Sequence, residues 1–211
     1  MQGNFLSQLL FTLSLVFLAF GLFNLGWFAW PSPTDAVQLN IPAGLLKGAP
    51  SGTTYASLAD YNLSLSWPRW LRVEQDGKLE VALVEIQDSD ASALVERPAQ
   101  VVVFEPTLAG LSVDPPGRMQ ASLAAGQSLA LSWSLVGRSR GEYPGKVLVS
   151  FGFYDQFSSE LVLVPVAVVD INVQVVGLWN NQPRLALWLG GVGMALWGAL
   201  FVLGRLVQVR K

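Results

Sequence analysis

The chain has 211 residues, of which 52% are hydrophobic and only 13% charged, with thirteen basic and fifteen acidic side chains and a net charge of −2. It contains no histidine and no cysteine, which removes the usual ligands of zinc and haem, cysteine nucleophiles and the Ser-His-Asp triad. The Lys and Arg residues are not clustered into a basic stripe, so the sequence predicts no nucleic-acid partner.

The first segment is apolar and uncharged. Residues 1–34 lack Asp, Glu, Lys and Arg, and residues 5–30 would span about 39 Å as a helix, more than the roughly 30 Å core of a bilayer. Trp27 and Trp30 suit the headgroup region, and Pro31 ends the helix. We predict an uncleaved transmembrane helix over residues 1–32. A cleaved signal peptide is the alternative, although the segment has no basic start and exceeds the roughly 7–15 apolar residues of such peptides.

The last segment has the same character. Residues 185–204 carry no charge and are framed by Arg184 and Arg205, which predicts a second transmembrane helix over residues 184–206. Residues 207–211 form a basic tail, and cytoplasmic flanks of membrane helices collect Lys and Arg. We therefore predict that both termini are cytoplasmic and that the middle domain is extracytoplasmic. Trp27, Trp30, Arg184 and Arg205 are the predicted membrane-interface residues.

Small residues recur every four positions in the second helix. Gly191, Ala195 and Ala199 would share one helix face, where small side chains let another helix approach closely. The partner would be the first helix or a helix of another subunit. Chance is the alternative, because Gly and Ala are common in membrane helices.

The middle segment, residues 33–180, changes to short runs of alternating polarity. It holds all fifteen acidic side chains of the chain. Residues 128–136 (SLALSWSLV) alternate apolar and polar side chains, the period-two pattern of a half-buried strand. No amphipathic helix pattern stands out, which argues against an α/β fold. The predicted strands are residues 36–41, 55–67, 79–86, 100–104, 119–123, 128–136, 146–154 and 161–176.

A more specific pattern covers the second half of this domain. The run GQSLALSWSLVGRSRGEYPGKVLVSFGF resembles the end of bacterial membrane-anchored immunoglobulin-like domains, and the resemblance extends over roughly residues 99–178. It implies that Tyr143 forms a tyrosine corner, whose hydroxyl bonds to nearby backbone. The predicted fold is mainly β, an immunoglobulin-like β-sandwich flanked by two transmembrane α-helices. Whether residues 35–98 join that sandwich or form a small second lobe is open, and we favour one domain.

Two aromatic clusters are candidates for contact with other molecules. Phe151, Phe153, Tyr154 and Phe157 form a candidate interaction surface; packing in the core around a bulge at Gly152 is the alternative. Trp67 and Trp70 lie close in sequence to Arg69 and Arg72, a pattern that permits a cation–π pair. The alternative is that Trp70 lies near the lipid headgroups, because the domain is tethered at both ends.

The polar residues do not predict chemistry. Asp88 and Asp90 lack the remaining ligands of an EF-hand loop. The acids Asp60, Glu74, Asp76, Glu80 and Glu85 show no spacing that singles out a catalytic pair. No catalytic, cofactor-binding or metal-binding residue is predicted.

The sequence thus predicts a non-enzymatic integral protein of the bacterial plasma membrane. Its predicted role is that of a structural or accessory subunit of a larger membrane assembly, with the lipid bilayer and other membrane subunits as partners. The alternative is a membrane-tethered ligand-binding or adhesion module, and an enzyme that uses only carboxylate, hydroxyl or amino groups is a third possibility.

Overall fold

The computed structural model describes residues 2–42, 60–86, 100–124, 126–154, 161–177 and 183–209. The chain divides into two compact units. One is helical and joins Met1–Pro31 with Gly177–Lys211; the other is Ser32–Val176.

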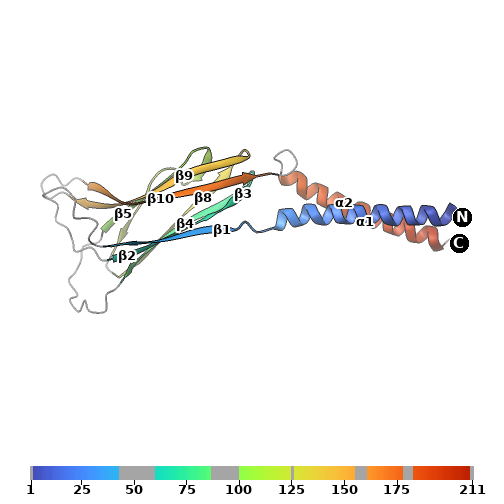
Figure 1. Cartoon of the computed structure of the whole chain (residues 1–211), viewed down its shortest axis with the longest axis horizontal. Helices are drawn as coiled ribbons and strands as arrows, with labels where there is room; N and C mark the ends of the chain where they lie inside the picture. The colour runs from blue at the N-terminus through green and yellow to red at the C-terminus, as the bar shows by residue number, and fades with distance from the viewer. Residues whose placement is uncertain are drawn as a thin grey trace. The chain divides into compact units, whose positions relative to one another are not determined.

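Both predicted helices are present. α1 (Gln2–Ala29) and α2 (Pro183–Val209) lie side by side in the helical unit (Figure 1). Within them, the 22-residue stretches Gln8–Ala29 and Leu185–Leu206 are long and apolar enough to cross a membrane, since each extends about 33 Å at 1.5 Å per residue. α2 runs past the predicted boundary at residue 206, so residues 207–209 of the predicted tail are helical.

Two five-stranded sheets form the second unit. The first has the order β1-β2-β4-β8-β6 and the second the order β3-β10-β9-β5-β7. The strands are β1 (Thr34–Ile41), β2 (Asp60–Pro68), β3 (Trp70–Arg72), β4 (Asp76–Ile86), β5 (Gln100–Leu108), β6 (Leu111–Asp114), β7 (Met119–Leu123), β8 (Ser128–Gly137), β9 (Gly141–Tyr154) and β10 (Leu161–Val176).

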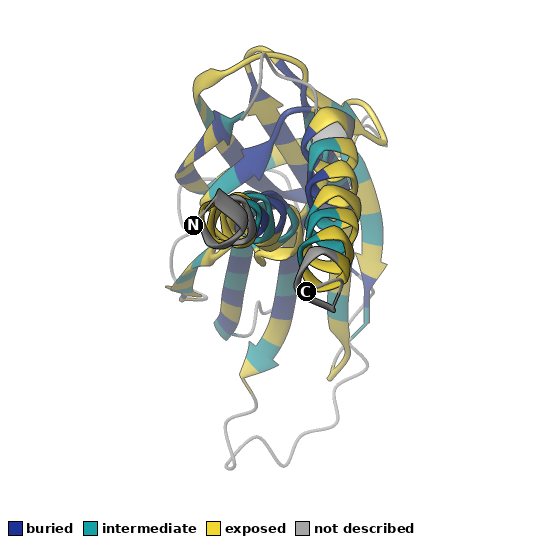
Figure 2. Cartoon of the chain, turned by 90° about the vertical axis from the view of Figure 1, so that its right-hand side faces the viewer, coloured by how far each residue is buried: buried dark blue, intermediate teal, exposed yellow. Residues whose placement is uncertain are grey.

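Alternating side chains build the core between the sheets. On β4, Leu79, Val81 and Leu83 are buried, whereas Lys78 and Glu80 are exposed. Figure 2 shows the same alternation as dark blue and yellow blocks along the strands. Trp133, Phe104 and Phe151 are the largest fully buried side chains. Burial on one face of each sheet is what holds a sandwich of this size together.

The strand predictions are confirmed with shifted ends. The predicted strand over residues 55–67 is described only from Asp60 onward. The sequence reading missed β3 and β6, because three and four residues are too few to display a period of two. β1, β2 and β4 lie in the same sheet as β8 and β6, so the described strands of residues 35–98 belong to the sandwich.

The tyrosine corner expected at Tyr143 is present. The Tyr143 hydroxyl donates a hydrogen bond to the carbonyl oxygen of Ser139 at 2.9 Å and lies 2.7 Å from Ser139 Oγ. Its ring packs over Gly110, which has a φ of +87° and where a Cβ would lie 2.7 Å from Tyr143 Cε1. Tyr143 thereby ties the β8–β9 turn to the β5–β6 turn.

Removing this hydroxyl is expected to destabilise the sandwich modestly. Tyr143→Phe deletes the bond to the Ser139 carbonyl, so the free energy of unfolding should fall by about 0.5–1.5 kcal/mol. Ser139→Ala keeps that carbonyl and should cost less. Thermal unfolding of both variants in detergent, followed by near-UV circular dichroism, makes the comparison. A larger loss for Ser139→Ala would contradict the assignment of the backbone carbonyl as the main partner.

Candidate interaction surfaces

The two helices pack through glycine. A Cβ at Gly193 would lie 3.1 Å from both Gly21 Cα and Phe17 O, and one at Gly190 would lie 2.9 Å from Leu25 Cγ. The missing side chains therefore permit backbone contact between α1 and α2, the arrangement typical of tightly packed membrane helices.

Two polar residues of α1 are fully buried in the helical unit. Ser14 and Asn24 both have 0% exposure. Ser14 Oγ donates to the carbonyl oxygen of Phe11 at 2.7 Å, and Asn24 Nδ2 donates to that of Phe20 at 2.8 Å. These bonds within their own helix satisfy polar groups that are costly to bury unpaired.

The predicted small-residue face is not the one that α1 covers. Gly191, Ala195 and Ala199 are exposed, and a Cβ at Gly191 would meet no described atom within 4 Å. The prediction that the first helix packs there is wrong, because α1 packs against the face of α2 that carries Gly190 and Gly193. Packing of the predicted face against another subunit stays a prediction.

Three of the four predicted membrane-interface side chains are described. Trp27 is half-buried in α1, and Trp30, just past its end, is 66% exposed. Arg205 lies with its guanidinium carbon 5.8 Å from the ring centroid of Phe201. The side chain of Arg184 lies outside the described part. Trp188 of α2 is 74% exposed. It was not among the predicted membrane-interface residues, since its sequence neighbourhood resembles the rest of the helix.

The aromatic cluster on β9 is part of the core. Phe151 is 1% exposed and Phe153 6%, so the predicted interaction surface is wrong for these two residues. Their spacing of two puts both on the inner face of β9, and Gly152 faces outward, where a Cβ would lie 2.9 Å from Leu161 Cδ1. The Tyr154 side chain and Phe157 lie outside the described residues.

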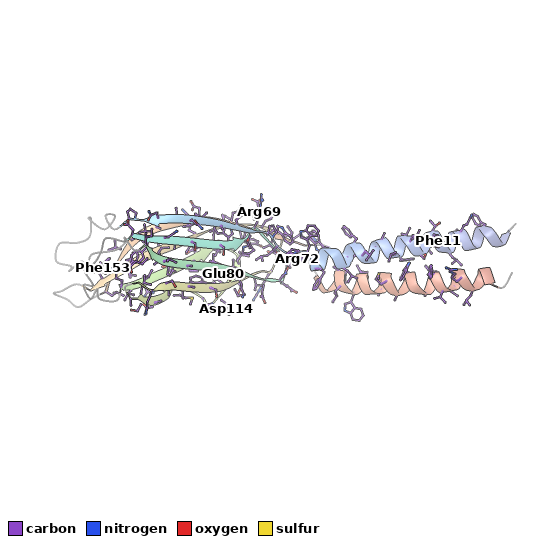
Figure 3. All side chains as sticks on the ribbon, turned by 90° about the horizontal axis from the view of Figure 1, so that it is seen from below. Phe11, Arg69, Arg72, Glu80, Asp114 and Phe153 are labelled. Atoms are coloured by element: carbon purple, nitrogen blue, oxygen red, sulfur yellow. The ribbon has the colours of Figure 1, made fainter. Side chains whose placement is uncertain are left out.

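The predicted cation–π pair forms at the opposite end of the sandwich from Phe153 (Figure 3). The Arg72 guanidinium carbon lies 4.9 Å from the ring centroid of Trp70, and Arg72 Nη1 donates to Gln75 Oε1 at 2.9 Å. Arg72 is 3% exposed, and this burial lowers the pKa of its guanidinium from the ordinary value. The pair holds the chain where it passes from the first sheet into the second.

The candidate acids do not assemble. Among the described residues, no group of three or more acidic side chains is placed to hold a metal ion. The Glu85 carboxylate accepts a hydrogen bond from the Gly126 backbone N–H at 2.6 Å, a structural contact at the β7–β8 turn. Asp88 and Asp90 lie outside the described ranges.

One edge of β10 is unpaired over most of its length among the described strands. β9 pairs with β10 from Leu161 to Val175, but β3, on the other side, pairs only with Gln174–Val176. No other described strand lies beside the edge from residue 161 to residue 173. A groove of about 1100 Å³ crosses β5, β9 and β10 and reaches Asp35 and Trp67 of the other sheet. Its remaining lining residues are Thr107, Ala109, Pro144, Gly145, Lys146, Leu148, Val168, Asp170, Ile171 and Asn172.

No family model matches the chain, and no curated protein matches it. The two sheets form a β-sandwich. The CARDB domain of the PF1109 protein from Pyrococcus furiosus aligns at 16% identity with a TM-score of 0.33, over 53% of this chain and 84% of that one. A PapD-like domain of human CEP192 aligns at 8% identity and 0.32, over 53% and 83%. SSP-19, an MSP-domain protein like family member in Caenorhabditis elegans, aligns at 12% and 0.27, over 49% and 88%.

Proposed function

We propose that this chain is a non-enzymatic, two-pass protein of the bacterial plasma membrane. It acts as a structural or accessory subunit that presents its sandwich to other proteins of a membrane assembly. Both termini face the cytoplasm, as the basic C-terminal residues favour, and the sandwich is extracytoplasmic.

The apolar outer surface of the helix pair carries this proposal. Phe5 is 70% exposed, Phe23 59% and Val202 56%. Apolar side chains in such number are unfavourable in water and favourable in hydrocarbon. The glycine contacts between α1 and α2 leave the predicted small-residue face, Gly191, Ala195 and Ala199, available to a helix of another subunit.

The adhesion alternative is weaker than it was from the sequence. Its candidate surface was Phe151, Phe153, Tyr154 and Phe157, and the first two of these are in the core. The absence of histidine and cysteine from the whole sequence supports a role without catalysis, since it removes the side chains most used as nucleophile, base or metal ligand.

Purification from native membranes tests the proposal. In a mild detergent, the full chain is expected to migrate as a particle containing further proteins, well above its own 22.8 kDa and the micelle. The same sample in a denaturing detergent should release the chain alone. A monomer without any co-purifying protein in every mild detergent would refute the accessory role.

A further inference from the structure

We infer that the open edge of β10 binds an extended, largely apolar segment of a partner protein as an added β-strand. The inference rests on the proposed function, because it specifies how the partner of the sandwich is held. An unpaired strand edge exposes a row of N–H and C=O groups that another strand can complete.

Backbone direction identifies the groups that would bind. The N–H of Gln174 donates to the Arg69 carbonyl, and the Val176 carbonyl accepts from Val73, so both residues point to the β3 side. Direction alternates along a strand, and Asn172, Asp170 and Val168 therefore direct their N–H and C=O groups to the open side.

Proline and a bulge, two devices that keep an exposed edge from pairing, occur only in the first half of β10. Pro165 lies there, and the pairing with β9 shifts between Pro165 and Ala167, which marks a bulge. Residues 167–173 carry neither, so this stretch is the site.

The flanks of the site are apolar and incompletely covered. On β10, Val164, Val166 and Ala167 pack against the core but are only partly buried. Val168 is 55% exposed on the outer face. An added strand with apolar side chains would cover these groups and gain the free energy of burying them.

Two polar features of the groove refine the partner. Trp67, which lines the groove, is 6% exposed, and its indole N–H has no acceptor within the part of the chain that the structure describes. Asp170 is paired with Lys146 at 3.5 Å, whereas Asp35 contributes a negative charge to the same groove. The segment best suited to the site is therefore apolar at alternate positions and carries a basic residue.

A matched pair of variants tests the backbone bonds. Asp170→Pro removes an N–H that faces the open edge, a position at which a strand tolerates proline. Asp170→Ala removes the same carboxylate but keeps the N–H. Both lose the exposed Lys146 pair, which contributes little to stability. The full chain and both variants are purified from native membranes in mild detergent, and bound partner and amide exchange along β10 are measured by mass spectrometry.

We expect Asp170→Pro to retain at least about tenfold less partner than Asp170→Ala, because it loses a hydrogen bond and obstructs the edge. In the wild-type complex, the amides of Val168, Asp170 and Asn172 should exchange at least about tenfold more slowly than after the partner is stripped. If Asp170→Pro does not fold, amide exchange in the wild-type chain with and without the partner tests the strand addition.

Three outcomes would overturn the inference. Equal retention by both variants, with edge amides that exchange as fast in the complex as without the partner, refutes strand addition but leaves the accessory role standing. Protection of the same amides in a particle that contains only this chain assigns the edge to a second copy instead. A wild-type chain that brings down no protein removes the accessory role and the inference together.

Discussion

Gly193→Leu is expected to separate α1 from α2, whereas Gly191→Leu, two residues away, leaves them together. A Cβ at Gly193 would lie 3.1 Å from Gly21 Cα and 3.1 Å from Phe17 O. Both are backbone atoms, which cannot move aside as a side chain can. A Cβ at Gly191 meets nothing described within 4 Å. Overpacking of this kind costs about 1–3 kcal/mol, a roughly fivefold to 150-fold shift from the closed to the separated helix pair.

The chain has no native cysteine, so spin labels can be attached to introduced cysteines alone. Spin labels at Leu13→Cys and Val202→Cys, both on exposed positions, report the distance between the helices in detergent or bilayers. The distribution should broaden toward long distances in Gly193→Leu and stay narrow in Gly191→Leu. If Gly191→Leu keeps the helix pair closed and also loses a co-purifying protein, a helix of another subunit packs on the face that carries Gly191. Broadening in both variants would contradict the packing described here.

The elements were predictable because their patterns are long. The two uncharged segments predict the helices. In strands such as β8, apolar side chains at alternate positions predict a half-buried strand. The tyrosine corner at Tyr143 was also predictable, because its hydrogen bond is local and spans four residues. The short segments β3 and β6 are strands because they pair with β10 and β8, respectively. Their own three and four residues do not show which distant strands they pair with.

The choice between faces was not predictable from one sequence. α2 has two small-residue faces, and only the complementary face of α1, with Gly21 at its centre, decides which one packs. Phe151 and Phe153 fit a core and an exposed patch equally well until the pairing of β9 with β5 and β10 shows which side faces the other sheet. The open edge of β10 was also not predictable from the sequence, because it depends on the residue at which β3 ends.

Trp133→Ala is expected to remove much of the stability of the sandwich. Trp133 is 1% exposed on β8, opposite Leu79 of β4, and is the largest of the fully buried side chains. Replacing a buried Trp by Ala costs about 3–5 kcal/mol, against a total of about 5–15 kcal/mol for a typical domain. For about 150 residues, this corresponds to a fall of roughly 10–20 °C in the Tm of the sandwich.

Trp133→Phe is the control that separates packing from hydrogen bonding. Within the described ranges the Trp133 indole N–H has no acceptor, and burying an unpaired donor costs about 1–3 kcal/mol. Phenylalanine fills most of the same space without that donor, so its net loss should stay below about 1.5 kcal/mol. Unfolding of both variants, followed by near-UV circular dichroism, gives the comparison. Equal losses for Phe and Ala would mean that the indole N–H is bonded in the folded protein, and that this bond rather than the ring volume stabilises the centre of the core.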